Sequence, residues 1–173
     1  MSILVEDGSI VTGAESYATV TEANTYHTNR NNALWTGTDT VKEAALRKAA
    51  AYLDGKYRKR WKGCRVDALT QPMEWPRANV LYEDNGEQLT YSSYLPITTI
   101  PQRLKDAQCE LALRSLSGDL AVDGETNIIS KKVDAIQTQF VPGAVRGQKT
   151  YQIVDQLLSD LLHPVGGGDV MRG

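Results

Sequence analysis

The chain has 173 residues, enough for one domain whose core buries roughly 70% of the surface that the unfolded chain would expose. Hydrophobic residues make up 41% and charged residues 23%, proportions that are typical of a globular protein and exclude an intrinsically disordered chain. The net charge of -2 excludes long-range attraction to nucleic acid or anionic membrane, so any basic behaviour must be local.

The N-terminal residues 1–16 mix a short apolar run with Asp-Gly and Thr-Gly pairs, which predicts an irregular arm. Thr19 followed by Glu22 has the spacing of a capping box, in which each residue bonds the backbone N–H of the other. A first helix is therefore expected at about 20–31.

Thr40 and Glu43 repeat the capping-box spacing ahead of an alanine-rich series of apolar residues with a period of 3.6. This pattern predicts a longer second helix at about 41–60. Alanine favours helix formation and permits close packing of neighbouring helices.

Extended chain is expected in the following region, where prolines interrupt the helical pattern. Asn85-Gly86 lies between two runs rich in apolar and aromatic residues, and this dipeptide suits a type I′ turn because both central residues need a positive φ. The sequence predicts a projecting β-hairpin arm at 79–92. Its aromatic strands and polar tip are suited to an interface between subunits. The candidate inter-subunit residues are Tyr82, Asn85, Gly86, Tyr91 and Tyr94.

A third helix should start at Pro101 and stop at Gly118, since proline suits the first helical position and glycine suits the end. Its apolar residues occupy more than one face, which is typical of a central helix. The predicted core pairs the second helix with the third, and Trp61 and Trp75 are expected at its border. The core positions are Leu46, Ala49, Ala50, Leu53, Leu104, Ala107, Leu111 and Leu113.

Two short strands that bend near Asp134 are expected between 127 and 141, because apolar residues alternate there with Lys and Gln. A last helix follows at about 151–162. Residues 163–173 contain Pro164 and three glycines, and they are expected to form a flexible tail. The fold class is therefore mainly α: a bundle of about four helices with a projecting β-hairpin and a second short β element, in a single domain over 1–162.

The leucines of the last helix give it more apolar surface than a short solvent-facing helix should carry. Either the chain's own bundle or another protein must cover them. The candidate partner-binding residues are Leu157, Leu158, Leu161, Leu162, His163 and Pro164.

The sequence predicts no enzyme, because neither His27 nor His163 has a partner arrangement that would make it a catalytic base. Nucleotide-binding glycine motifs are missing, and no cofactor is expected. Cys64 and Cys109 lack a neighbouring Cys or His at ligand spacing, so we expect two free thiols in a reducing cytoplasm and no metal. The lack of a signal sequence or long apolar run indicates no membrane association.

A basic run from 56 to 65 is the strongest local feature of the sequence. Its cations are accompanied by Tyr57 and Trp61, which could stack on bases. The alternative is structural: cations at the end of a helix complement its dipole, and their long stems cover apolar surface. The run contains Lys56, Arg58, Lys59, Arg60, Lys62 and Arg65, 6 of the 19 basic residues.

A series of short segments resembles a family of tailed-phage proteins in its order along nearly the whole chain. The series includes Leu4-Val5-Glu6-Asp7-Gly8, Ser16-Tyr17, Ala49-Ala50-Ala51-Tyr52-Leu53-Asp54, Trp61-Lys62-Gly63, Glu74-Trp75-Pro76-Arg77, Ile100-Pro101-Gln102, Cys109-Glu110-Leu111-Ala112-Leu113 and Pro142-Gly143-Ala144. The family carries the label of a DnaT-like single-stranded-DNA-binding protein, and it is similar to the head–tail connectors, or neck adaptors, of phage virions.

The resemblance implies a structural virion protein, made in the bacterial host cytoplasm and located at the neck. It would form a ring, expected to be a dodecamer, between the portal protein and a downstream neck or tail protein. Packaged DNA would pass through the ring with non-specific contacts to the basic run, and the last helix and tail would bind the portal. The alternative is a single-stranded-DNA-binding accessory protein of replication.

Overall fold

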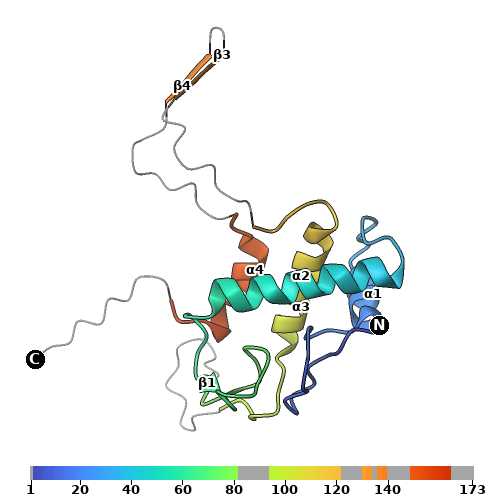
Figure 1. The fold of residues 1–173 in the computed structure, drawn as a ribbon, viewed down its shortest axis with the longest axis vertical. Coiled ribbons are helices and arrows are strands. Elements are labelled where there is room, and N and C mark those ends of the chain that lie inside the picture. Colours follow the sequence, from blue (N-terminus) through green and yellow to red (C-terminus); the bar gives the residue numbers. More distant parts are fainter. Residues whose placement is uncertain (1, 82–93, 122–129, 134–135, 140–148, 165–173) are drawn as a thin grey trace, which may run out of the picture.

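The computed structural model describes residues 2–81, 94–121, 130–133, 136–139 and 149–164, with the backbone alone for 130–133 and 136–139 (Figure 1). Within these ranges the fold is mainly helical, as the sequence predicted, with four α-helices and two short antiparallel strand pairs. The division into one domain and a tail stays a prediction.

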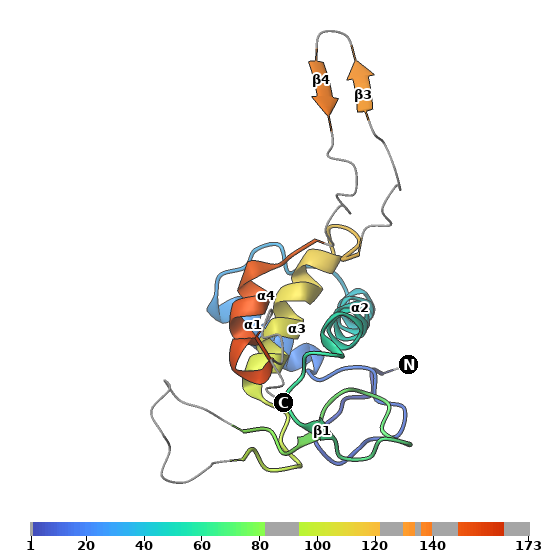
Figure 2. The same ribbon diagram turned by 90° about the vertical axis from the view of Figure 1, so that its left-hand side faces the viewer.

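Helices α2 (Asp39–Tyr57) and α3 (Gln102–Ser115) form the centre of the fold. Their facing sides carry small residues, and Ala49, Ala50 and Ala107 are buried between them. Helix α3 also contacts α1 (Val20–Asn29) and α4 (Gln152–Leu157), and Figure 2 shows it between α4 and α2. The predicted central helix is thus confirmed.

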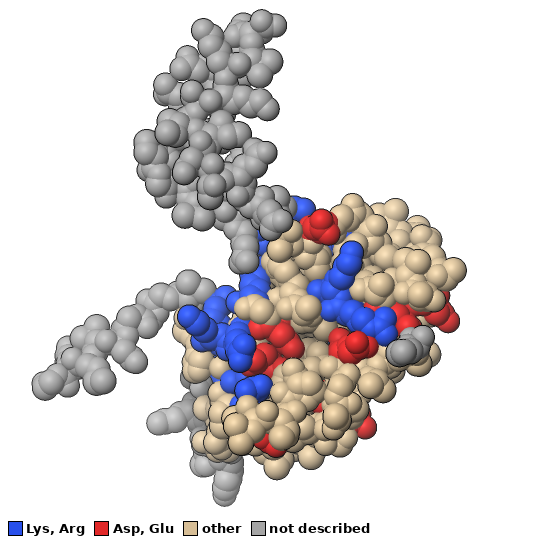
Figure 3. All heavy atoms as spheres, viewed as in Figure 1, with Lys and Arg blue, Asp and Glu red and all other residues tan. Residues whose placement is uncertain are grey.

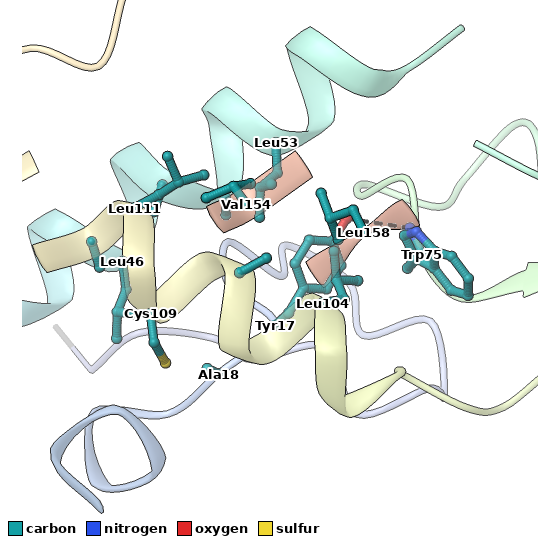
Figure 4. Packing of buried hydrophobic residues seen from close by; sticks show 14 of the residues in the cluster. Tyr17, Ala18, Leu46, Leu53, Trp75, Leu104, Cys109, Leu111, Val154 and Leu158 are labelled. Carbon is teal, nitrogen blue, oxygen red and sulfur yellow. Dashed lines mark hydrogen bonds between the residues drawn. The ribbon is translucent and has the colours of Figure 1, made fainter. Parts of the chain in front are cut away.

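The predicted core is buried with one exception: Leu113 is only half-buried, and its neighbour Ala112 faces inward instead. Trp61 and Trp75, expected at the border, are themselves buried. Figure 4 shows the packed side chains, with Trp75 at one end. The buried predicted positions are Leu46, Ala49, Ala50, Leu53, Leu104, Ala107 and Leu111.

One of the two predicted capping boxes forms. At the start of α1, the Thr19 hydroxyl accepts from the Glu22 N–H at 3.1 Å, and the Glu22 carboxylate accepts from the Thr19 N–H at 2.7 Å. The Thr40 box was wrong, because α2 begins at Asp39 with Thr38 as its N-cap. The carboxylate of Glu43 instead accepts from the backbone N–H of Ile3 at 3.4 Å.

The last helix is shorter than the predicted 151–162. Helix α4 ends at Leu157, and a 3₁₀ turn, η1 (Ser159–Leu161), follows it. The Ser159 hydroxyl donates to the Gln156 carbonyl at 2.9 Å, a local bond that competes with continued α-helix. The tighter turn lets both Leu158 and Leu161 point into the core.

The N-terminal arm is irregular, as expected, and it is built into the body of the protein. Val5 and Ser16 form a parallel bridge, and the buried Glu6 carboxylate accepts backbone N–H groups, among them that of Gly8 at 2.9 Å. Gly8 has φ +105 and a Cβ there would lie 1.8 Å from the Thr98 carbonyl oxygen, so only glycine fits.

Two strand pairs lie outside the helices. Strand β1 (Cys64–Arg65) pairs with β2 (Arg77–Ala78), a short sheet that the sequence did not predict. Strand β3 (Ser130–Val133) pairs with β4 (Ile136–Gln139), which confirms the predicted pair around Asp134. The β3–β4 pair contacts no other helix or strand that the structure describes, and Figure 2 shows it standing away from the helices.

Leu111→Ala should lower the free energy of unfolding by about 2–5 kcal/mol, because it removes a fully buried side chain from the α2–α3 contact and leaves a cavity. Urea denaturation followed by circular dichroism measures the change. Leu34→Ala is the matched control, since that side chain is 75% exposed, and it should change stability by no more than about 0.5 kcal/mol. Equal losses in the two variants would contradict the assigned core.

Candidate nucleic-acid interface

The basic segment, residues 56–65, runs from the last turn of α2 into β1. It is joined to residues 159–164, which comprise η1 and the three residues after it and which we call the C-terminal turn. Trp61 and Leu162 form an antiparallel bridge. The Lys62 N–H donates to the Leu161 carbonyl at 3.0 Å, and the His163 N–H donates to the Arg60 carbonyl at 2.7 Å. The segment is therefore an integral part of the fold rather than a free basic strand.

Both aromatic side chains of the basic segment are buried. Tyr57 is inaccessible and Trp61 is 3% exposed. The Trp61 ring packs between Tyr57, at 5.7 Å between centroids, and Trp75, at 5.8 Å. The Tyr57 hydroxyl donates to Asp155 at 2.6 Å. Neither ring is available to stack on a nucleotide base in this conformation.

Lys56 lies among tyrosine rings between α2 and α4. Its Nζ is 5.3 Å from the ring centroid of Tyr52, 5.1 Å from that of Tyr57 and 6.0 Å from that of Tyr151. Burial lowers the pKa of Lys56, and the negative charge of Asp155 opposes that shift. This cation therefore serves the packing of α4 on α2.

The arginines of the basic segment also have partners within the chain. Arg58 pairs with Glu74 at 3.4 Å, Arg60 donates to the His163 carbonyl at 3.3 Å, and Arg65 donates to the Ala68 carbonyl at 2.6 Å. Arg58 is 67% exposed, so its ion pair is weak and leaves the guanidinium accessible.

Lys59 is exposed and Lys62 lines a groove. Figure 3 shows red carboxylates among the blue cations near the C-terminal end of α2, so this face is not uniformly positive.

Arg77 is a buried charge that sequence reasoning missed. Its guanidinium pairs with Glu74 at 3.1 Å and donates to the carbonyls of Lys62 at 2.9 Å and Gly63 at 2.8 Å. Burial lowers the pKa of Arg77, and Glu74 opposes the shift. The string Glu74-Trp75-Pro76-Arg77 was the available signal, and its arginine fixes the backbone of the basic segment.

A second buried polar junction joins the N-terminal arm, α2 and the residues before β2. The Tyr17 hydroxyl donates to Asp54 at 2.5 Å and accepts from the backbone N–H groups of Glu74 at 3.1 Å and Trp75 at 3.3 Å. Burial raises the pKa of Asp54 to about 6, and the hydrogen bond from Tyr17 opposes that rise. The junction is structural and was not foreseen.

Most of the predicted inter-subunit residues lie outside the described ranges, namely Tyr82, Asn85, Gly86 and Tyr91. Tyr94 is described and is 59% exposed. It forms an antiparallel bridge with Leu81, and the Leu95 N–H donates to the Val80 carbonyl at 2.9 Å. Residues 80–81 and 94–95 are therefore held side by side, while the interface role of the predicted residues stays a prediction.

The predicted partner-binding leucines are covered by their own chain. Leu158, Leu161 and Leu162 are buried in the core, and Leu157 is half-buried against it. Of the two covers that the sequence left open, the described structure shows the chain's own bundle, while a role of these residues in binding the portal stays a prediction. His163 and Pro164 are exposed at the end of the turn.

A groove of about 650 Å³ lies beside the basic segment. Its walls come from the segment itself, residues 79–81, helix α4 and the C-terminal turn. Cations and carboxylates both line it, so it lacks the single sign of charge that a phosphate backbone attracts. The lining includes Arg60, Lys62, Asn79, Leu81, Asp155, Asp160, Leu162, His163 and Pro164.

His27, Cys64 and Cys109 are of residue types that can serve catalysis or bind a metal ion. His27 is buried, packs on Trp35 and shares a hydrogen bond of 3.0 Å with the Asn32 side chain. Cys64 and Cys109 are free thiols, as expected. Among the described residues, no group of three or more His, Cys, Asp or Glu side chains could hold a metal ion. None of the helices in these ranges is long and apolar enough to cross a membrane.

Comparison with known proteins gives a family match along the whole chain. A family model described as "Putative DnaT-like ssDNA binding protein" matches residues 1–173. No curated protein matches the chain, and no solved structure does. The matched range includes the helical body, the basic segment and the groove.

Asp54→Asn should remove a pH dependence of stability. Because the folded-state pKa of about 6 lies above the ordinary value of 3.8, the folded protein binds this proton more tightly than the unfolded chain. Stability therefore falls as pH rises through that window. The stability difference between pH 4 and pH 7 should change by roughly 1–3 kcal/mol in the variant. Urea unfolding at both pH values measures it.

The exposed Asp119→Asn is the control for this experiment, and it should keep the pH dependence of the unsubstituted protein. Parallel pH profiles for Asp54→Asn and the unsubstituted protein would show that Asp54 is not the responsible group.

Proposed function

We propose that this chain, which belongs to the family of DnaT-like ssDNA binding proteins, is a structural virion protein rather than an enzyme. In this proposal it is a head–tail adaptor, made in the bacterial cytoplasm, that forms a ring between the portal and a downstream tail protein. Packaged DNA passes through the ring and touches it without sequence preference.

The observation that carries the proposal is the β3–β4 pair, which contacts no other element that the structure describes. A two-stranded hairpin is marginally stable by itself in water, so such an element gains from a partner outside its own chain. In a ring, an arm of this kind can reach the adjacent subunit, and closed symmetry repeats the contact around the assembly.

The charge distribution supports the same role. A channel that DNA must traverse needs cations that weaken repulsion without holding the phosphates. In the basic segment Lys56, Arg60 and Arg65 have partners within the chain, and Lys59 and Arg58 are the more accessible cations. Modest, sequence-independent attraction is what this arrangement offers.

The second candidate, a single-stranded-DNA-binding accessory protein of replication, is favoured by the description of the matched family. Proteins that bind single strands without sequence preference combine a positive groove with exposed aromatic side chains on which bases stack. Here Tyr57 and Trp61 are buried, and the groove beside them contains Asp155 and Asp160. These features favour the adaptor.

Quantitative mass spectrometry of purified, DNA-filled particles tests the virion role. The chain should be present at about the copy number of the portal protein, because a ring stacked on the portal repeats the same symmetry. The major capsid protein is the internal standard. Recovery of the chain only from infected-cell lysate, and not from particles, would overturn the proposal.

Binding to an oligothymidylate separates the two candidates. At about 150 mM salt an adaptor should bind no more tightly than the roughly 10⁻⁶–10⁻⁴ M of non-specific contacts, with a decline as salt increases. Fluorescence anisotropy measures the affinity. Arg58→Gln with Lys59→Gln should weaken binding equally for any sequence, while Lys48→Gln on α2 is the matched control. Nanomolar binding that survives physiological salt would favour the replication role.

A further inference from the structure

Strands β3 and β4 form an arm that lies apart from the other described elements. The pair contacts no other helix or strand that the structure describes, and Figure 1 shows it well away from the helices. A two-stranded pair has little stability by itself in water. The residue types at its paired positions therefore indicate what the arm contacts outside its own chain.

The register of the strand pair divides its eight residues between two faces. Lys131 pairs with Thr138, and the next residue, Lys132, pairs with Gln137. Directly paired residues share a face, and successive residues of a strand lie on opposite faces. The two lysines are therefore on opposite faces of the arm. What we call the polar face consists of Ser130, Lys132, Gln137 and Gln139, and the other face consists of Lys131, Val133, Ile136 and Thr138.

The polar face has the composition of a phosphate-binding surface. Lysine supplies a positive charge, and serine and glutamine supply neutral hydrogen-bond donors, all of them residue types that proteins use on DNA phosphates. None of the eight paired residues is acidic, and Asp134, the nearest acid in the sequence, follows Val133 outside the paired positions. The charge of the polar face therefore complements that of a DNA backbone.

The same composition argues against a protein partner for the polar face. The centre of a protein interface is apolar and poor in charged residues. The polar face has no apolar residue at its four positions, whereas Val133 and Ile136 pair directly on the other face. The other face is therefore the one that remains for the contact between subunits.

The form of the arm also suits DNA. The major groove of duplex DNA is about 12 Å wide and admits a two-stranded β-ribbon. The β3–β4 pair is such a ribbon, and none of the other described helices and strands contacts it. Both of its strands can therefore approach the phosphates that border the groove.

We propose that the polar face of the β3–β4 arm contacts the phosphate backbone of duplex DNA, with Lys132 as its cation. Phosphate contacts carry no sequence information, so the contact has no sequence preference. One lysine in each subunit gives a weak contact, and a ring repeats it once per subunit. This inference rests on the proposed adaptor function and adds a DNA-contacting element outside the basic segment.

Salt titrations of two neighbouring lysine variants test the contact. The full-length chain and its Lys132→Gln variant are titrated against a short fluorescein-labelled duplex, and fluorescence anisotropy measures the affinity. Loss of one phosphate contact should lower the slope of log affinity against log salt by about 0.9, and the affinity by roughly tenfold at about 50 mM salt. Lys131→Gln is the matched control, since it removes the same charge from the other face. It should change the affinity by less than about threefold.

A conservative variant separates charge from misfolding. Lys132→Arg keeps the charge and should retain the affinity of the unsubstituted protein, while far-ultraviolet circular dichroism should be the same for all three variants. Equal losses in Lys131→Gln and Lys132→Gln, or a loss in Lys132→Arg as large as that in Lys132→Gln, overturn the proposal. Unchanged duplex binding by Lys132→Gln also overturns it, whether or not binding to an oligothymidylate or self-association is weakened.

These outcomes are distinct from those for the virion role. If Lys132→Gln loses duplex affinity while the chain is missing from particles, the contact of the polar face stands and the adaptor function fails. If the chain is present in particles at portal copy number while Lys132→Gln binds DNA as the unsubstituted protein does, the adaptor function stands and the contact of the polar face fails.

Discussion

The close approach of α2 and α3 is the constraint on which the other contacts depend. The buried alanines at 49, 50 and 107 let the two helices approach closely. This brings the buried amide of Gln108 within 2.9 Å of the Leu46 carbonyl and 2.7 Å of the Ser16 hydroxyl, while its oxygen accepts from the Tyr17 N–H at 3.0 Å. The N-terminal arm is thereby fixed to both helices. The Tyr17 hydroxyl in turn bonds Asp54 of α2 and the peptide before β2.

The basic segment shows how far a run of charge in sequence differs from a charged surface. A binding surface needs cations that are accessible to a ligand. Here Lys56 lies over the Tyr57 ring, and Arg60 and Arg65 donate to backbone carbonyls of their own chain. Arg77, outside the run, holds the segment's backbone from within. The segment acts first as a joint between α2, the short sheet and the C-terminal turn. Its more accessible cations are Arg58 and Lys59, and two exposed charges are consistent with weak rather than tight contact to DNA.

Periodicity in the sequence predicted the four helices, the central place of α3 and the β3–β4 pair, because these depend on residues close together along the chain. The site was less predictable. Arg77 and Gln108 look like solvent-facing polar residues in sequence, and their partners come from distant segments. The leucines of the last helix predicted an apolar surface that must be covered. An apolar stripe does not show whether the same chain or another chain covers it. Leu69 lies in a region without a periodic pattern, so the sequence did not predict that its side chain would be exposed.

Two pairs of described segments, far apart in the sequence, are held together by a few bonds. Leu81 and Tyr94 form an antiparallel bridge. The Tyr151 hydroxyl donates to the Leu120 carbonyl at 3.1 Å, and Lys149 donates to the Asp119 carbonyl at 3.1 Å. The entropic cost of closing a loop grows only with the logarithm of its length. Insertions and deletions between residues held together in this way therefore change the free energy of folding little. We therefore expect that a change in the number of residues between Leu81 and Tyr94, or between Leu120 and Lys149, leaves the helical fold intact.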